Sequence, residues 1–383
     1  MTAQPEAPIS QELLQQAADN YYHCLNLPRG SNVIVVSESI PEGGRNVDAS
    51  VLLRNTLADQ IRQKAERDDH SVAHLSFNNE TTEDEFRDST SRTLSEYCLE
   101  DGDKPPASTT IVYLGDYWAN RGGLYQAANE HGLRHDIRIA GSIGLTSGDI
   151  RVLSALTREK QREMSQVSNV LEAKFQRNPK GFIQVKTLSA EGHEHLLNLP
   201  YDCHQAPFKT DPGRIDDEHP IKMGAFRFHN IPGGHFFGAP YEFKHTNGKF
   251  VAQGIVFNVV DGLIADITDD IEGSYEKLDP DQRRALDYVK GGGGLPLSEL
   301  GIGLHRQVNV PSFSDCSMLT RTKSGVYFGL GEAHSDTSEA EQIRGLPSGR
   351  VHYNFILSDP ELSLLTPSLD DPIPIYQHQA TAD

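Results

Sequence analysis

The sequence is poor in cysteine, tryptophan and basic residues, and it has no long apolar run. Its 383 residues include one Trp, four Cys, and 35 Lys and Arg against 54 Asp and Glu, for a net charge of −19. Cys24, Cys98, Cys203 and Cys316 are far apart and show no Cys-x-x-Cys spacing, which argues against a zinc ribbon or a disulfide framework. For Cys203 and Cys316 we expect buried free thiols.

The shortage of positive charge also limits the classes of partner. Nucleic-acid binding needs clustered Lys and Arg to contact phosphates, so the acidic balance argues against such a partner. No segment approaches the roughly 18 consecutive apolar residues of a membrane-spanning helix. The N-terminal residues lack the basic start and apolar stretch of a signal peptide. We therefore expect a cytoplasmic protein with no nucleic-acid or membrane partner, whose charge keeps it soluble.

The first half of the chain alternates strand-like and helix-like segments. Residues 31–39 and 108–116 are short β-branched runs, and residues 51–66 between them have apolar residues at helical spacing. Residues 122–132 are typical of a helix that ends at a glycine, and a third strand-like run follows within 135–144. This alternation predicts an α/β layer with a mostly parallel sheet. No dinucleotide-binding or Walker pattern follows these strands.

A domain boundary is predicted near the middle of the chain. Residues 150–176 have the apolar spacing of one long helix with a solvated charged face. Pro179 and Gly181 then break the pattern. Because the chain is longer than a single core usually serves, we predict an α/β domain at 1–178 and a second domain at 179–383.

The second half is β-rich and histidine-rich. Strand-like runs occupy 181–189, 248–270, 324–331 and 350–357, and residues 279–290 form the one clear helix. The predicted fold class is thus an α/β N-terminal domain plus a β-rich (α+β) C-terminal domain. This half also holds 11 of the 16 His residues, which directs the search for chemistry here.

Several glycine-flanked segments of the second half carry metal-capable side chains. The segment NIPGGHFFGAP contains His235, and LSELGIGLHRQ contains Glu299 and His305. Tyr327 follows in SGVYFGLG, and His352 and Asn354 lie in RVHYNFIL.

In this order the segments resemble the aminopeptidase T family of metallopeptidases and the related 2,5-dihydroxypyridine dioxygenases. The family has a Glu before Ala-Pro where this chain has His235, and a Glu in a Leu-Gly context that is matched by Glu299. It then has a His where this chain has Tyr327, and a His-x-Asp strand where it has His352 and Asn354. The resemblance covers about 180 residues (roughly the second half) and reaches the first half only in its general α/β pattern. It implies an aminopeptidase T-like fold and a homodimer.

The departures from the family pattern imply a changed metal site. In the peptidases these five positions bind two metals, and here Glu299 and His352 keep the family's residue types. A metal pair needs bridging carboxylates, so we expect one metal per chain. His235, Glu299 and His352 form a two-His, one-carboxylate set that is typical of open mononuclear Fe(II) sites. Zinc hydrolases use the same donor types, so Zn(II) is the alternative.

Three function classes follow from this ligand set. The first is a non-heme Fe(II) oxygenase acting on a small polar or aromatic molecule, and the second is a zinc-dependent aminopeptidase-like or amidase-like hydrolase. The third is a metal-free binding or partner protein that keeps the fold. Tyr327, Asn354 and His305 are candidate catalytic residues: Tyr327 as a hydrogen-bond donor or acid, and Asn354 as a group that orients a substrate carbonyl. Taken alone, His235 equally fits a packing histidine, and His305 fits a solvated loop residue.

Overall fold

The structure is a computed structural model that divides into two compact units. It describes residues 9–39, 48–78, 81–97, 108–115, 119–132, 136–211, 215, 222–223, 226–239, 243–305, 316–331, 352–367 and 371–377. The first unit comprises 1–164, 211–234 and 308–321, and the second comprises 165–210, 235–307 and 322–383. The predicted boundary between residues 178 and 179 falls within the second unit, between helix α6 (Arg158–Arg177) and strand β5 (Lys180–Leu188).

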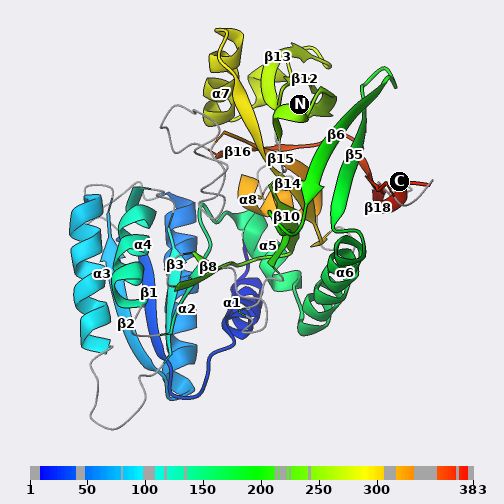
Figure 1. Ribbon diagram of the computed structural model, residues 1–383. Coiled ribbons are helices and arrows are strands. Elements are labelled where there is room, and N and C mark those ends of the chain that lie inside the picture. The colour runs from blue at the N-terminus through cyan, green and yellow to red at the C-terminus, as the bar shows by residue number, and fades with distance from the viewer. Residues whose placement is uncertain are drawn as a thin grey trace. The chain divides into compact units, whose positions relative to one another are not determined.

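The first unit is built on a sheet with the strand order β2-β1-β3-β4-β9-β8 (Figure 1). The pairs β1–β2, β1–β3, β3–β4 and β4–β9 are parallel, and β8 runs antiparallel to β9. This confirms the predicted mostly parallel sheet. The strands are β1 (Asn32–Glu38), β2 (Ser71–Phe77), β3 (Thr109–Leu114), β4 (Ile137–Gly141), β8 (Lys222–Met223) and β9 (Phe226–Asn230).

Helices cover both faces of this sheet. One apolar cluster joins Val33 and Val35 of β1 to three helices on one face, and another joins Ile34 and Val36 to two helices on the other. Successive residues of a strand point to opposite faces of the sheet. A sheet with helices on both faces therefore needs strands that are apolar at every position. The first face is covered by α1 (Gln11–Leu25), α2 (Ala49–Arg67) and α5 (Ser147–Ala155), and the second by α3 (Glu83–Tyr97) and α4 (Ala119–Gly132).

The prediction of one long helix over residues 150–176 is wrong. The segment contains the end of α5 and most of α6, separated at Leu156 and Thr157. Thr157 starts the new helix by accepting a hydrogen bond from Lys160 N at its Oγ1, at 3.4 Å. The apolar spacing continues through this break because Leu156 is itself buried, so periodicity alone does not reveal it.

The second unit is built on antiparallel strands in the order β16-β15-β14-β13-β12-β11-β6-β5-β17-β18, and β10 pairs with β14. It confirms the β-rich second half. The strands besides β5 are β6 (Glu194–Asp202), β10 (His235–Gly238), β11 (Gly248–Ala252), β12 (Ile255–Val260), β13 (Leu263–Asp269), β14 (Leu295–Gly303), β15 (Val326–Gly331), β16 (His352–Ile356), β17 (Glu361–Leu365) and β18 (Ile373–Gln377). Short β7 (Lys209–Asp211) lies where the chain passes from the second unit to the first.

Turn residues separate these strands as the sequence predicts. The run 248–270 forms β11, β12 and β13, and tight turns at Gln253–Gly254 and Asp261–Gly262 place all four residues at positive φ. The predicted helix at 279–290 is α7 (Pro280–Lys290). The mixed architecture, a parallel sheet plus a large antiparallel sheet, is an α+β fold of two units.

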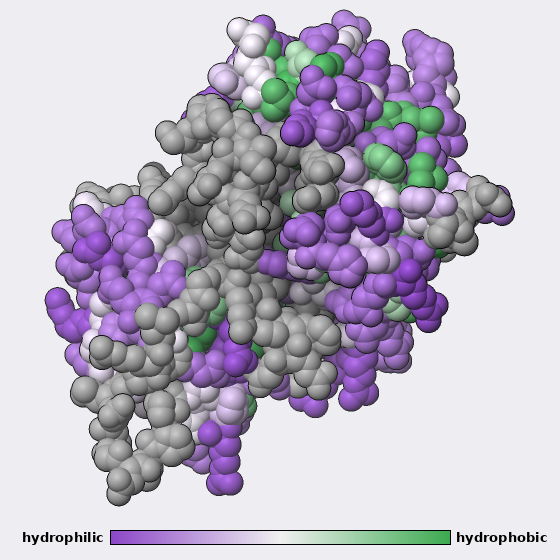
Figure 2. Space-filling view, viewed as in Figure 1, coloured by the Kyte–Doolittle hydropathy of each residue, from purple (hydrophilic) through white to green (hydrophobic). Residues whose placement is uncertain are grey.

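The described surface is mostly hydrophilic. On the face that Figure 2 shows, hydrophilic residues predominate and hydrophobic ones appear in small separate patches. None of the helices within the described ranges is long and apolar enough to cross a membrane.

Candidate functional site

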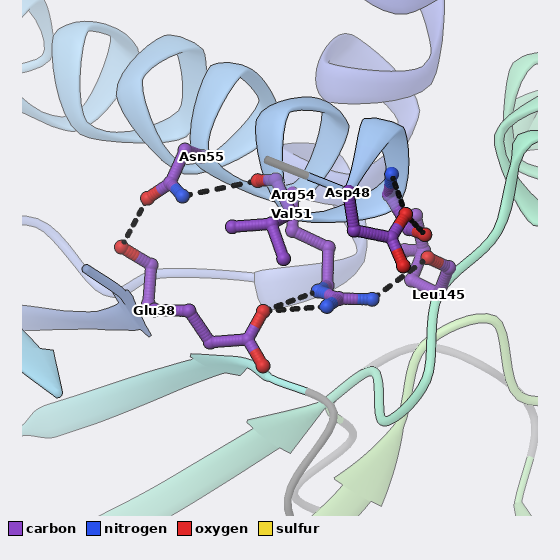
Figure 3. A network of polar contacts seen from close by, with 8 residues as sticks. Glu38, Asp48, Val51, Arg54, Asn55 and Leu145 are labelled. Atoms are coloured by element: carbon purple, nitrogen blue, oxygen red, sulfur yellow. Dashed lines mark hydrogen bonds and ion pairs between the residues drawn. The ribbon is translucent and has the colours of Figure 1, made fainter. Parts of the chain in front are cut away.

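A buried ion pair lies at the carboxyl end of β1 in the first unit (Figure 3). Arg54 of α2 donates from Nε and Nη2 to Glu38 Oε2, at 2.8 and 2.5 Å, and from Nη1 to the Leu145 carbonyl at 3.4 Å. The side chains of Arg54 and Glu38 are 3% and 8% exposed. Ligands of parallel α/β sheets usually bind beyond the carboxyl ends of the strands. Here the opposite charges of Arg54 and Glu38 neutralise each other, which favours a structural role for this ion pair.

Asp149 is a second buried carboxylate of the first unit, and its contacts are also structural. It accepts hydrogen bonds from Thr146 N and Oγ1, at 2.6 and 2.9 Å, and thereby caps α5. It also accepts from Ser317 N and Oγ, both at 3.2 Å. Burial raises the pKa of Asp149, and these donors oppose that rise. Asp149 therefore fastens the segment around Ser317 to the start of α5.

In the second unit, strands β10, β14, β15 and β16 bring most of the predicted site residues to one face. His235 is opposite Gly303, Tyr327 is opposite Gly301, and Glu299 is opposite Gly329. Gly329 is in turn opposite Asn354, and Gly331 is opposite His352. Because paired residues share a face and the side-chain period is two, all five predicted residues of these strands lie on the same face.

The chain enters this face through Gly234. Its φ of +103° lies in the region that favours glycine, and its N–H donates to the Asp211 carbonyl at 2.6 Å. This turn starts β10 and places His235 at the first position of the strand.

A packed aromatic layer lies beneath the face. Phe328 and Phe355 alternate with the site residues, so they point to the opposite side of β15 and β16. Phe328 packs on Phe250, with ring centroids 4.7 Å apart, and Phe355 packs on Phe257 at 5.1 Å. This layer supports the strands that carry the polar residues.

Glycines of β14 leave room for side chains that cross the face. A Cβ on Gly301 would lie 2.1 Å from the Tyr327 ring, so this ring lies directly on the Gly301 backbone. The Tyr327 hydroxyl then donates to Glu299 Oε1 at 2.7 Å. Both residues are buried, so the carboxylate is held by a donor of the protein itself.

His235 is held by Lys323, a residue of the 3-10 turn η4 (Thr322–Ser324). The Lys323 Nζ contacts His235 Nδ1 within hydrogen-bonding distance, and Lys323 is fully buried. A Cβ on Gly303 would lie 2.3 Å from the Lys323 carbonyl carbon, so this glycine lets the turn approach β14. When Lys323 is protonated, its ammonium group has only donors and His235 Nδ1 is the acceptor.

His235 and Glu299 stand on either side of the Tyr327 ring. His235 is opposite Gly303, which is four residues from Glu299 on β14, a separation of about 13 Å at the usual rise per strand residue. Gly301, under the Tyr327 ring, lies between them. The ring centroids of His235 and Tyr327 are 6.3 Å apart, and those of His235 and Phe237 are 4.5 Å apart.

The described contacts of His235 and Glu299 are with other side chains of the protein, and the iron site of His235, Glu299 and His352 stays a prediction. A single ion with bonds of about 2.1 Å needs its ligands within about 3–4 Å of one another. Nδ1 of His235 contacts Lys323 Nζ, and Glu299 accepts from Tyr327. The backbone of His352 is placed in β16, but its side chain lies outside the described residues. Within the described ranges, no group of three or more His, Cys, Asp or Glu side chains could hold a metal ion.

The two remaining candidates have different surroundings. His305 follows β14 and is fully buried, unlike the solvated loop residue that was its alternative. Asn354 is half-buried, and its carbonyl accepts from Gln282 Nε2 of α7 at 2.7 Å. Lys323 is the residue that sequence reasoning missed, because a single lysine in TRTKSG carries no signal of burial.

Comparison with family models, with curated proteins and with solved structures gave no match. The resemblance to aminopeptidase T therefore stays a prediction.

Proposed function

We propose that the second unit carries a metal-independent site for a small polar molecule, formed by Lys323, His235, Tyr327 and Glu299. The observation that carries this proposal is that two of the three predicted metal donors, His235 and Glu299, contact other polar side chains of the protein. Lys323 contacts His235 Nδ1, and Tyr327 donates to Glu299 Oε1. Such pairs supply hydrogen bonds and proton transfer without a metal.

The two pairs give the proposed site a defined set of donors. When Nδ1 of His235 accepts from a protonated Lys323, the proton of a neutral ring is on Nε2. Tyr327 and Glu299 form a donor and acceptor pair, and a ligand that replaces this contact can accept from the hydroxyl and donate to the carboxylate. This supports a metal-free binding protein, which is the third of the function classes above, or a metal-independent acid–base enzyme, which is not among those three.

A mononuclear metal enzyme is the second candidate. The residue of β15 that is paired with Glu299 is Gly329, a glycine, which leaves room between Glu299 and strand β16. Gly329 is paired with both Glu299 and Asn354, and it has no side chain of its own on this face. Glu299 and His352 would then be the protein ligands, with Asn354 nearby. This candidate includes the Fe(II) oxygenase and the zinc hydrolase, and with them the homodimer that the resemblance implies.

Elemental analysis of the purified full-length protein separates the two candidates. We expect well under one metal per chain, and no change of melting temperature with a chelator. The same result is expected for Lys323→Met and for the control Lys180→Met, which alters an exposed lysine. About one Fe or Zn per chain that is lost in Glu299→Gln and in His352→Ala would overturn the metal-independent proposal and favour the metal enzyme.

A ligand screen tests the metal-independent site directly. Hydroxylated aromatic and heteroaromatic acids and aminoacyl amides are added to chelator-treated protein, and the melting temperature is recorded. A hit should lose its thermal shift in Tyr327→Phe and keep it in Tyr288→Phe, because Tyr288 is 48% exposed and outside the site. A shift that survives Tyr327→Phe and His235→Gln would place the ligand elsewhere and contradict the proposal.

A further inference from the structure

The first unit has an open cleft of about 780 Å³ in which cationic side chains gather. It lies where α1 and α2 end and where α6 begins, beside the amino ends of β1 and β2. Its size is that of a site for a small molecule. The side chains that decide its chemistry are those of Lys64, Arg67, His70 and Arg158, with Asp19 and Asp68 as the carboxylates.

Both carboxylates of the cleft are engaged by neighbouring donors. Asp19 forms an ion pair with Lys64, and Asp68 Oδ2 accepts from the Tyr22 hydroxyl at 2.9 Å. Burial and the contact with Asp68 raise the pKa of this Tyr22 hydroxyl, which therefore stays protonated and keeps donating. The ion pair of Asp19 and the hydroxyl contact of Asp68 are therefore with Lys64 and Tyr22 and not with the arginines.

Among the residues that the structure describes, the two arginines of the cleft have no acidic partner. In the described part of the chain neither Arg67 nor Arg158 forms an ion pair, and Arg67 donates from Nε to the Gln63 carbonyl at 3.2 Å. Both are exposed to solvent. In a chain of net charge −19, two unpaired guanidinium groups in one concave site form a local positive field that attracts anions.

His70 supplies a buried polar atom in the same cleft. Its Nδ1 is buried and has no hydrogen-bond partner within the described residues. A buried ring nitrogen without a partner is costly unless a ligand or water satisfies it. His70 follows α2 immediately before β2, so the fold fixes its backbone at the cleft.

We propose that this cleft binds the phosphate group of a small molecule. Guanidinium forks match phosphate oxygens with paired hydrogen bonds, and Arg67 and Arg158 are available for such contacts. Arg158 is the first residue of the 20-residue helix α6, whose amino end adds a favourable field for an anion. This site is independent of the site proposed for the second unit.

Isothermal titration calorimetry with inorganic pyrophosphate tests the proposal on the full-length protein. We expect one binding event per chain whose affinity falls as the salt concentration rises. The double variant Arg67→Gln and Arg158→Gln should bind at least about tenfold more weakly, because each guanidinium contributes a charge-assisted contact. The control Arg162→Gln should bind like the unaltered protein, since Arg162 is exposed on the same helix and does not line the cleft.

Three results would overturn the proposal. The first is the absence of pyrophosphate binding at millimolar concentration. The second is equal affinity of the double variant and the Arg162→Gln control, which would locate the anion elsewhere. The third is equally tight binding of citrate, which would show that the cleft takes anions without preference for phosphate. Unchanged melting temperatures of the variants exclude misfolding as the cause of a loss, and ADP compared with pyrophosphate tells whether a nucleoside is also accepted.

Discussion

At the scale of single residues, the chemistry of the second unit depends on neighbours that are distant in sequence. Residue types and their order indicated His235, Glu299 and Tyr327 as functional candidates, and the structure brings all three to one face. The contact that changes their interpretation comes from Lys323, 88 residues beyond His235. No local pattern predicts that a lysine will be buried there, because lysine is usually exposed. The candidate residues could therefore be predicted, but their hydrogen-bond partners could not.

Cys203 provides a prediction about pH. Burial raises the pKa of its thiol to about 11, above the ordinary value, and nearby Asp202 adds to the rise. Thiolate is the reactive form, so at pH 8 iodoacetamide should modify Cys203 in the folded protein about 100-fold more slowly than in the unfolded chain. Between pH 8 and 10 the folded rate should keep rising about tenfold per pH unit.

Mass spectrometry of the modified peptide measures this rate, and protein in guanidinium chloride is the control. A folded rate that levels off at or below pH 9 would mean that the thiol has an ordinary pKa.

At the scale of elements, the glycines of β14 determine how closely other segments approach the strand. A Cβ on Gly303 would lie 2.3 Å from the Lys323 carbonyl carbon and 2.7 Å from Ser324 N, which are backbone atoms. Gly303→Ala should therefore displace the turn η4 and destabilise the protein by about 1–3 kcal/mol. Urea unfolding measures the change.

Gly291→Ala is the matched control for this substitution. Its nearest atoms would be at 3.4 Å, an ordinary contact, and Gly291 is not at positive φ. We expect a change within about 0.5 kcal/mol. If the two variants are equally stable, the close approach of η4 to β14 is not what holds Lys323 beside His235.

Several elements of both units were predicted from sequence, and two of the errors have clear physical causes. The strands β1, β3 and β4 were predicted because they are continuous apolar runs. Strand β2 was missed because it is an edge strand with mostly exposed or half-buried residues, so its pattern is weak. The break between α5 and α6 was missed because a buried leucine continues the apolar spacing across it.

At the scale of the whole molecule, the first unit takes strand β9 from far along the chain. Residues 226–230 pair in parallel with β4, and Phe226 and Phe228 belong to the apolar cluster on one face of the sheet. A fragment of residues 1–178, the predicted first domain, lacks them. It should expose the fully buried strand β4 as a sheet edge and should aggregate or stay partly unfolded.

Circular dichroism, thermal unfolding and size-exclusion chromatography of this fragment test the prediction, with the full-length chain as the reference. A monomeric fragment with a cooperative transition would support the boundary between residues 178 and 179.

The position of β9 also has a consequence for biosynthesis. As the chain leaves the ribosome, strands β1 to β4 emerge first, and residues 165–210, which belong to the other unit, must follow before β9 appears. Until then β4 offers its unpaired backbone and apolar side chains to any neighbouring chain. The nascent protein therefore passes through a stage in which the edge of β4 is exposed. Slower synthesis between residues 141 and 226 lengthens this stage, and a chaperone that covers strand edges is most useful during it.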